Sequence, residues 1–326
     1  MDQAFWDGTI GLLQELRNRN HEILIFFDIV NRNDQLSLQH TPITFLCSSC
    51  GFEEPNVPGI FNISQLPATL TNFTIYNNVK FEPTFDLSRC TSLKSLFITG
   101  LNGKPLDGAG SLTKLNVAFT FDKPIINLPT SITDLTCPIH TAPMLSVQHL
   151  QRIYLRDFRH MFNPSFPHLR VLLIGEIEAD GLLLITPDNF PVLQDFSTSF
   201  KSTNDNKTGS FFDLTKLPPS LRVLDITTQT ALPLLPNGIE RLFISFSILR
   251  AGEIPPTVTH LKLNGSDLPQ LDPTLLPPSL ISLFPAHIDN TKYTAYDLRR
   301  INSTLFLNTI EVRDNCDGTR NDGRSV

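Results

Sequence analysis

Apolar residues recur along this chain in a short pattern: two are three positions apart, and a third follows two positions later. The pattern is clearest in Leu217–Ile226 (LPPSLRVLDI), where Leu221, Leu224 and Ile226 are the apolar positions. The same phrase, with its leading proline, returns at 66–75, 128–137, 235–244, 254–263 and 276–285. Residues two apart on a strand point to the same face. Each copy therefore predicts a short strand with one apolar side.

Weaker copies without the proline fill the gaps between these phrases. The first apolar positions of all copies are Leu70, Leu93, Leu112, Ile132, Leu150, Leu169, Leu193, Leu221, Ile239, Val258, Leu280 and Leu307. Their spacing of 18 to 28 residues is typical of a repeat protein. One unit alone buries too little apolar surface to offset the entropy of ordering it, so neighbouring units must share a core. The pattern predicts a solenoid of parallel strands.

The prolines indicate what connects these strands. The chain has 25 of them, and six copies place one three residues before the first apolar position. Proline fixes φ and lacks a backbone donor, which suits a polyproline-like return better than a helix. We therefore expect strands on a concave face and mostly non-helical, polyproline or loop returns on a convex face.

Two stretches carry a resemblance to a known family. Phe121–Ile125 (FDKPI), followed by Leu128–Ile132 (LPTSI), resembles the FNIP-type leucine-rich repeat, and Gly252–Leu261 (GEIPPTVTHL) resembles its second half. The resemblance extends loosely over residues 60–315 and implies a leucine-rich-repeat solenoid. Leu232–Pro236 (LPLLP) is also similar to the proline-rich repeat of bacterial effectors. Those proteins often carry a large helical ubiquitin-ligase domain, for which this chain has no room.

We expect three regions: residues 1–42 as an N-terminal cap, 43–312 as the solenoid with about 12 to 13 repeats, and 313–326 as a polar, disordered tail. The N-terminal segment predicts a short helix, because apolar residues recur there at mostly helical spacing, at Phe5, Trp6, Ile10, Leu13 and Leu16. An alternative interpretation is a docking module similar to an F-box, although the Leu-Pro opening of that motif is missing. The repeats would then be the substrate-recognition part of a ubiquitin ligase.

Composition excludes several classes of function. The formal charge of −6 argues against nucleic acid as a partner, which would favour a basic stripe. The longest apolar run, Ile23–Phe27, is too short to span a bilayer. Met1, Asp2 and Gln3 do not begin a signal peptide, and the five cysteines form no clustered cap. We therefore expect a cytoplasmic protein that does not bind membranes.

No motif for catalysis or for a cofactor is present in the sequence. Cys47 and Cys50 have metal-knuckle spacing, but a zinc site would need a second such pair. The stretch 314–318 (DNCDG) lacks the regularly alternating carboxylates of a calcium loop. The eight histidines are scattered, and no nucleophile or phosphate-loop motif occurs. We expect no enzyme activity, no cofactor and no metal.

The middle residue of each strand should point away from the core, and this row is the candidate binding site. It reads Thr74, Phe97, Asn116, Thr136, Tyr154, Leu173, Ser197, Asp225, Phe243, Lys262, Phe284 and Glu311. Large apolar and arginine side chains on one face are typical of protein interfaces. The candidate partner-binding residues are Phe97, Arg152, Tyr154, Arg156, Leu173, Arg241, Phe243, Lys262 and Phe284.

The hypothesis is a non-catalytic scaffold that binds a protein on its concave face. The alternative for the row itself is that phenylalanine-rich strands pack against each other across a crowded face. The pattern names no particular partner and no oligomeric state.

Overall fold

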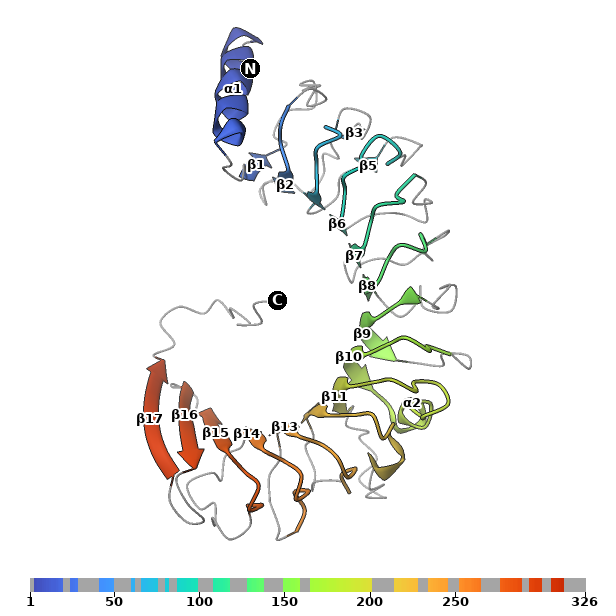
Figure 1. The fold of residues 1–326 in the computed structure, drawn as a ribbon, viewed down its shortest axis with the longest axis vertical. Helices are drawn as coiled ribbons and strands as arrows, with labels where there is room; N and C mark the ends of the chain where they lie inside the picture. The colour runs from blue at the N-terminus through green and yellow to red at the C-terminus, as the bar shows by residue number, and fades with distance from the viewer. Residues whose placement is uncertain are drawn as a thin grey trace. The chain divides into compact units, whose positions relative to one another are not determined.

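The computed structural model describes residues 3–19, 24–28, 41–49, 60–61, 66–75, 80–81, 87–98, 108–117, 128–137, 149–158, 165–200, 214–227, 234–245, 252–264, 276–288, 293–300 and 306–313. The chain forms two compact units, Met1–Leu169 and Arg170–Val326. Each unit is built on a sheet of short strands (Figure 1).

The first unit begins with helix α1 (Gln3–Asn18) and continues as a parallel sheet whose strands follow one another in chain order. The strands are β1 (Leu24–Asp28), β2 (Phe45–Ser49), β4 (Asn72–Ile75), β6 (Ser95–Ile98), β7 (Lys114–Val117), β8 (Asp134–Cys137) and β9 (Arg152–Phe158). A separate small parallel pair is formed by β3 (Ile60–Phe61) and β5 (Lys80–Phe81).

The second unit repeats this architecture. Its parallel strands are β10 (Val171–Ile177), β11 (Asp195–Phe200), β12 (Val223–Thr227), β13 (Arg241–Ser245), β14 (His260–Asn264) and β15 (Ser282–Ile288). Helix α2 (Ala179–Leu182) and the 3-10 helix η4 (Leu214–Lys216) lie in connections between strands. β16 (Tyr293–Arg300) and β17 (Phe306–Arg313) then complete the sheet. Both units are thus parallel β-solenoids with little helix, as the sequence predicted.

The predicted apolar triplets form the core. Within the parallel repeats, every triplet residue whose burial is described is at most 3% exposed. Register aligns equivalent positions in neighbouring strands, as shown by Leu224 beside Leu242 and Ile226 beside Ile244. The burial pattern alternates strictly along these strands. One face of each sheet is therefore core, and we call the opposite face the outward face.

The prediction of a last parallel repeat was wrong. The copy that begins at Leu307 was expected to add a parallel strand, with Glu311 in the middle row. Instead β16 runs antiparallel to β15, and β17 runs antiparallel to β16. Only residues 289–292 separate β15 from β16. A parallel crossover needs a dozen or more residues, whereas a reversal needs only a few. Short connections therefore end the parallel repeats at β15.

The N-terminal region contains two strands that the sequence analysis missed. β2 pairs with β4 in the repeat register, with Leu46 beside Phe73, and Ile43 is fully buried in the core. β1, which lies inside the predicted 1–42 cap, pairs in parallel with β2. The predicted helix is present as α1. The role of α1 as a cap stays a prediction.

The leading proline of a repeat has a defined place in a turn. The carbonyl oxygens of five such prolines accept a hydrogen bond from the N–H of the first apolar residue, at 3.0–3.1 Å. These pairs are Pro67 with Leu70, Pro129 with Ile132, Pro218 with Leu221, Pro255 with Val258, and Pro277 with Leu280. As the first residue of the turn, proline needs no donor of its own. Three of these turns carry a second proline at the next position, where its fixed φ is favoured.

The Ser/Thr of the phrase ties neighbouring repeats together. Its hydroxyl donates to the carbonyl of the first apolar residue of the preceding repeat, at 2.7–2.9 Å. The pairs are Thr69 with Ile43, Ser111 with Leu93, Ser131 with Leu112, Ser220 with Leu193, Thr257 with Ile239, and Ser279 with Val258. We call this series the hydroxyl ladder. It provides hydrogen bonds from one repeat to the next.

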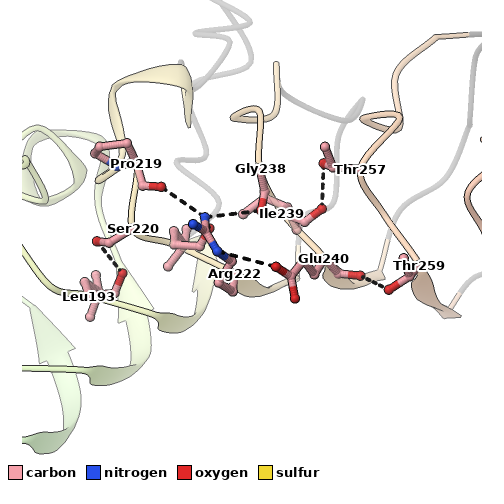
Figure 2. Close-up of polar contacts among 10 residues, drawn as sticks. Leu193, Pro219, Ser220, Arg222, Gly238, Ile239, Glu240, Thr257 and Thr259 are labelled. Carbon is pink, nitrogen blue, oxygen red and sulfur yellow. Dashed lines mark hydrogen bonds and ion pairs between the residues drawn. The ribbon is translucent and has the colours of Figure 1, made fainter.

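One rung of the ladder is replaced by an arginine. Gly238 occupies the Ser/Thr position of its repeat and has a positive φ of +95°. Arg222 Nη1 instead donates to the Leu221 carbonyl at 3.1 Å. It also donates to the Pro219 carbonyl at 3.1 Å (Figure 2). At this repeat a guanidinium therefore binds the Leu221 carbonyl in place of a hydroxyl.

Ser220→Ala is expected to lower the free energy of unfolding by about 0.5–1.5 kcal/mol, because it removes the donor to the Leu193 carbonyl. Ser220→Thr keeps the hydroxyl and serves as the matched control. Urea unfolding of both variants checks this prediction. Equal stability of the two variants would show that the ladder contributes nothing.

Candidate partner-binding faces

In the first unit, the middle row is continuous in register. Thr74 lies beside Phe97, Phe97 beside Asn116, Asn116 beside Thr136, and Thr136 beside Tyr154. All five side chains are half-buried and alternate with core residues. The row therefore lies on the outward face, as predicted, but its side chains are only partly exposed.

In the second unit, the row runs from β10 to β15. Its members are aligned by register in the order Leu173, Ser197, Asp225, Phe243, Lys262 and Phe284. Each of these side chains is half-buried. Here too the predicted row lies on the face opposite the core.

The structure brings some candidate residues together and separates others. On β9, Arg152 and Arg156 are exposed and flank Tyr154 along one strand. Two strands, β7 and β8, lie between this group and Phe97 on β6. Phe97 is therefore not part of the β9 group.

In the second unit, Arg241, Phe243, Lys262 and Phe284 lie on the adjacent strands β13, β14 and β15. Leu173 is separated from them by β11 and β12. The best-formed cluster of candidate residues is thus the one on β13–β15.

Sequence analysis missed His260 in this cluster. It lies beside Arg241 in register and is half-buried on the outward face. The signal was present in the sequence, because His260 is two residues before Lys262 and so points to the same side of the strand. It was missed because only the middle position of each strand was considered.

Cys47 was also missed as a member of the first-unit row. Register places it beside Thr74, and it is 8% exposed. Burial raises the pKa of the Cys47 thiol above its ordinary value. The reactive thiolate is therefore a smaller fraction at neutral pH than in an exposed cysteine. Cys50, its C-x-x-C partner in the sequence, lies outside the described residues.

Two ion pairs lie on or beside the outward faces. Lys114 Nζ is 3.8 Å from Asp134 Oδ2, and Asp134 lies beside Arg152 in register. Arg222 Nε is 3.4 Å from Glu240 Oε1 (Figure 2). Both pairs are partly exposed, so each contributes little to stability. They matter for the candidate site because Asp134 and Glu240 already have a cationic partner each.

The described residues contain no group of three or more histidine, cysteine or acidic side chains that could hold a metal ion. Cys47, Cys90 and Cys137 are buried thiols. No helix within the described ranges is long and apolar enough to cross a membrane.

Comparisons with protein-family models, with curated proteins and with solved structures found no match. The resemblance to the FNIP-type repeat therefore stays a prediction from the sequence.

Proposed function

We propose that this chain is a leucine-rich-repeat protein of the FNIP type that acts in the cytoplasm as a non-catalytic scaffold. It binds a protein partner through the outward faces of its sheets. The observation that carries the proposal is the continuous row of half-exposed middle residues on β4–β9 and β10–β15, which includes Tyr154 and Phe243. The core uses the opposite face, and these large side chains are partly exposed on the outward face, as is typical of side chains that bind a partner.

The kinds of side chain in the row also support this proposal. Tyrosine and arginine are enriched among interface residues that dominate affinity, and β9 carries both on its outward face. On β13–β15, two phenylalanines alternate with basic residues. The competing explanation is that these side chains stabilise the sheet by packing on one another.

Affinity capture with the full chain tests the proposal. The wild-type protein is compared with a Tyr154→Ala/Phe243→Ala variant and with Pro219→Ala, whose side chain is exposed in a turn. Proteins that bind wild type and Pro219→Ala, but not the double variant, are the expected partners. Identical sets of captured proteins from all three forms would contradict the proposal.

A second candidate function is substrate recognition for a ubiquitin ligase, with α1 as the docking element. One observation favours it: the apolar face of α1 is incompletely covered. Leu12 is 57% exposed, and Ile10, Leu13 and Leu16 are half-buried, whereas core residues of the strands are almost fully buried. An amphipathic helix with such a face is suited to binding a groove on another protein.

Leu12→Glu tests the second candidate. If α1 docks to a ligase, full-length protein isolated from its native cell should carry ubiquitin-ligase activity, and Leu12→Glu should abolish that activity without changing the melting temperature. Wild-type protein without ligase activity would contradict this candidate. Loss of thermal stability in Leu12→Glu would instead assign α1 to the cap.

A further inference from the structure

A basic and aromatic patch lies on the outward face of the second unit. It consists of Arg241 and Phe243 on β13, His260 and Lys262 on β14, and Phe284 on β15. Register places Arg241 beside His260, and Lys262 between Phe243 and Phe284. Arg241 is exposed, and the other four side chains are half-buried. We call these five residues the basic-aromatic patch.

The positive charges of the patch are not neutralised by described neighbours. Neither Arg241 nor Lys262 makes an ion pair with any residue that the structure describes. Glu240, which precedes Arg241, pairs with Arg222 at 3.4 Å. Two acidic residues lie on strands beside the patch: Asp225, next to Phe243 in register, and Asp297 on β16. Arg241 and Lys262 are the two cations that the patch itself offers to a ligand, on a chain whose formal charge is −6.

A chain of polar contacts links His260 to Glu240, the residue before β13. The Thr259 hydroxyl is 3.1 Å from the Glu240 carbonyl oxygen, which also accepts hydrogen bonds from the backbone N–H groups of Thr259 and His260. The same hydroxyl oxygen is 2.9 Å from His260 Nδ1. This contact orients the ring and leaves Nε2 as the nitrogen that can interact with a ligand.

We propose that the basic-aromatic patch binds an extended acidic segment of the protein partner, in which carboxylates alternate with apolar side chains. This inference rests on the proposed function and adds the chemistry of the partner. Arg241 can bind a carboxylate through two parallel hydrogen bonds, and Lys262 can bind a second one as a point charge.

The spacing of the two phenylalanines suits an apolar side chain of that segment. Strands are about 4.8 Å apart, so Phe243 and Phe284, separated by one strand, lie about 10 Å apart. One apolar side chain fits between them, over the methylene stem of Lys262. Nucleic acid is a poorer match, because two fixed cations neutralise few phosphates.

Peptide display on the immobilised full chain tests this inference. A library of random peptides is selected on the wild type, and the peptide that is most enriched is then synthesised. Its affinity is measured for the wild type, Arg241→Glu/Lys262→Glu, Phe243→Ala and Lys216→Glu. Lys216 is an exposed basic residue of η4 outside the patch and is the control for a general change of charge.

We expect enriched peptides with excess Asp and Glu beside apolar residues. The synthesised peptide should bind Arg241→Glu/Lys262→Glu at least tenfold more weakly than the wild type, and Lys216→Glu almost as tightly. Raising NaCl from about 50 to about 300 mM should weaken binding to the wild type and have little effect on the charge-reversed variant. Thermal melting confirms that each variant is folded.

Enrichment of neutral or basic peptides, no enrichment, or stronger binding of single-stranded RNA would overturn the inference. If Phe243→Ala weakens binding but charge reversal does not, the acidic-partner inference fails and the proposed function stands. If neither variant weakens binding, this face is not the binding site, and both fail for the second unit.

Discussion

Leu224→Ala is expected to lower the free energy of unfolding by about 2–5 kcal/mol. Leu224 is fully buried, and register places it between Phe196 on β11 and Leu242 on β13. Truncation removes three carbon atoms and leaves a space that these neighbours fill only in part, because each is held by its own strand. Denaturant unfolding of the full chain measures the loss.

Val223→Ala is the matched control for this substitution. Val223 is adjacent in sequence but half-buried on the outward face. Its truncation should cost less than about 1 kcal/mol, mainly through strand propensity. A Leu224→Ala variant as stable as Val223→Ala would show that the assigned register and core are wrong.

Phe243→Ala is expected to weaken partner binding by 2 kcal/mol or more, which is about thirtyfold in the dissociation constant. Phe243 lies between Asp225 and Lys262 in register, inside the row rather than at its end. Interface residues at such central positions dominate affinity, because neighbouring contacts exclude water from them. Tyr154→Ala, in the first unit, should have a similar effect, because tyrosine is enriched among the interface residues that dominate affinity.

Pro219→Ala provides the control for binding. It changes an exposed turn residue and keeps the carbonyl that Arg222 binds, so affinity should stay nearly the same. Calorimetric titration of the captured partner into each variant measures these effects. Equal affinities of wild type, Tyr154→Ala and Phe243→Ala would remove the outward face as the binding site.

The repeat register could be predicted because both apolar spacings of the phrase have direct physical causes. Leu224 and Ile226 share a strand face, while Leu221 ends the closed turn that precedes the strand. The strand β2 was missed because the third position of its copy is Ser48, which does not match an apolar pattern.

Other features depend on neighbours in space. The phrase contains Ser or Thr at a fixed position, but only the fold shows that its hydroxyl binds the preceding repeat. Likewise, Arg222 replaces the missing hydroxyl at Gly238 because of where its long side chain lies. The reversal at β16 follows from the length of a connection, which an apolar pattern does not record.

The candidate site could be predicted only in part. Alternation along the strands gave the correct face for Phe243 and Lys262. It did not give the fraction of each side chain that is exposed, because that depends on the size of the side chains in the neighbouring strands. It also did not show that His260 lies beside Arg241 in register, or that Glu240 forms an ion pair with Arg222.

The most direct test of the binding-face proposal is the melting temperature of Phe243→Ala, measured beside that of Leu224→Ala and together with its partner affinity. If the row is a recognition surface, Phe243→Ala should melt close to the wild type and bind about thirtyfold more weakly, while Leu224→Ala melts many degrees lower. If Phe243→Ala lowers the melting temperature as much as Leu224→Ala does, the row is packing rather than recognition, and the proposed function is contradicted.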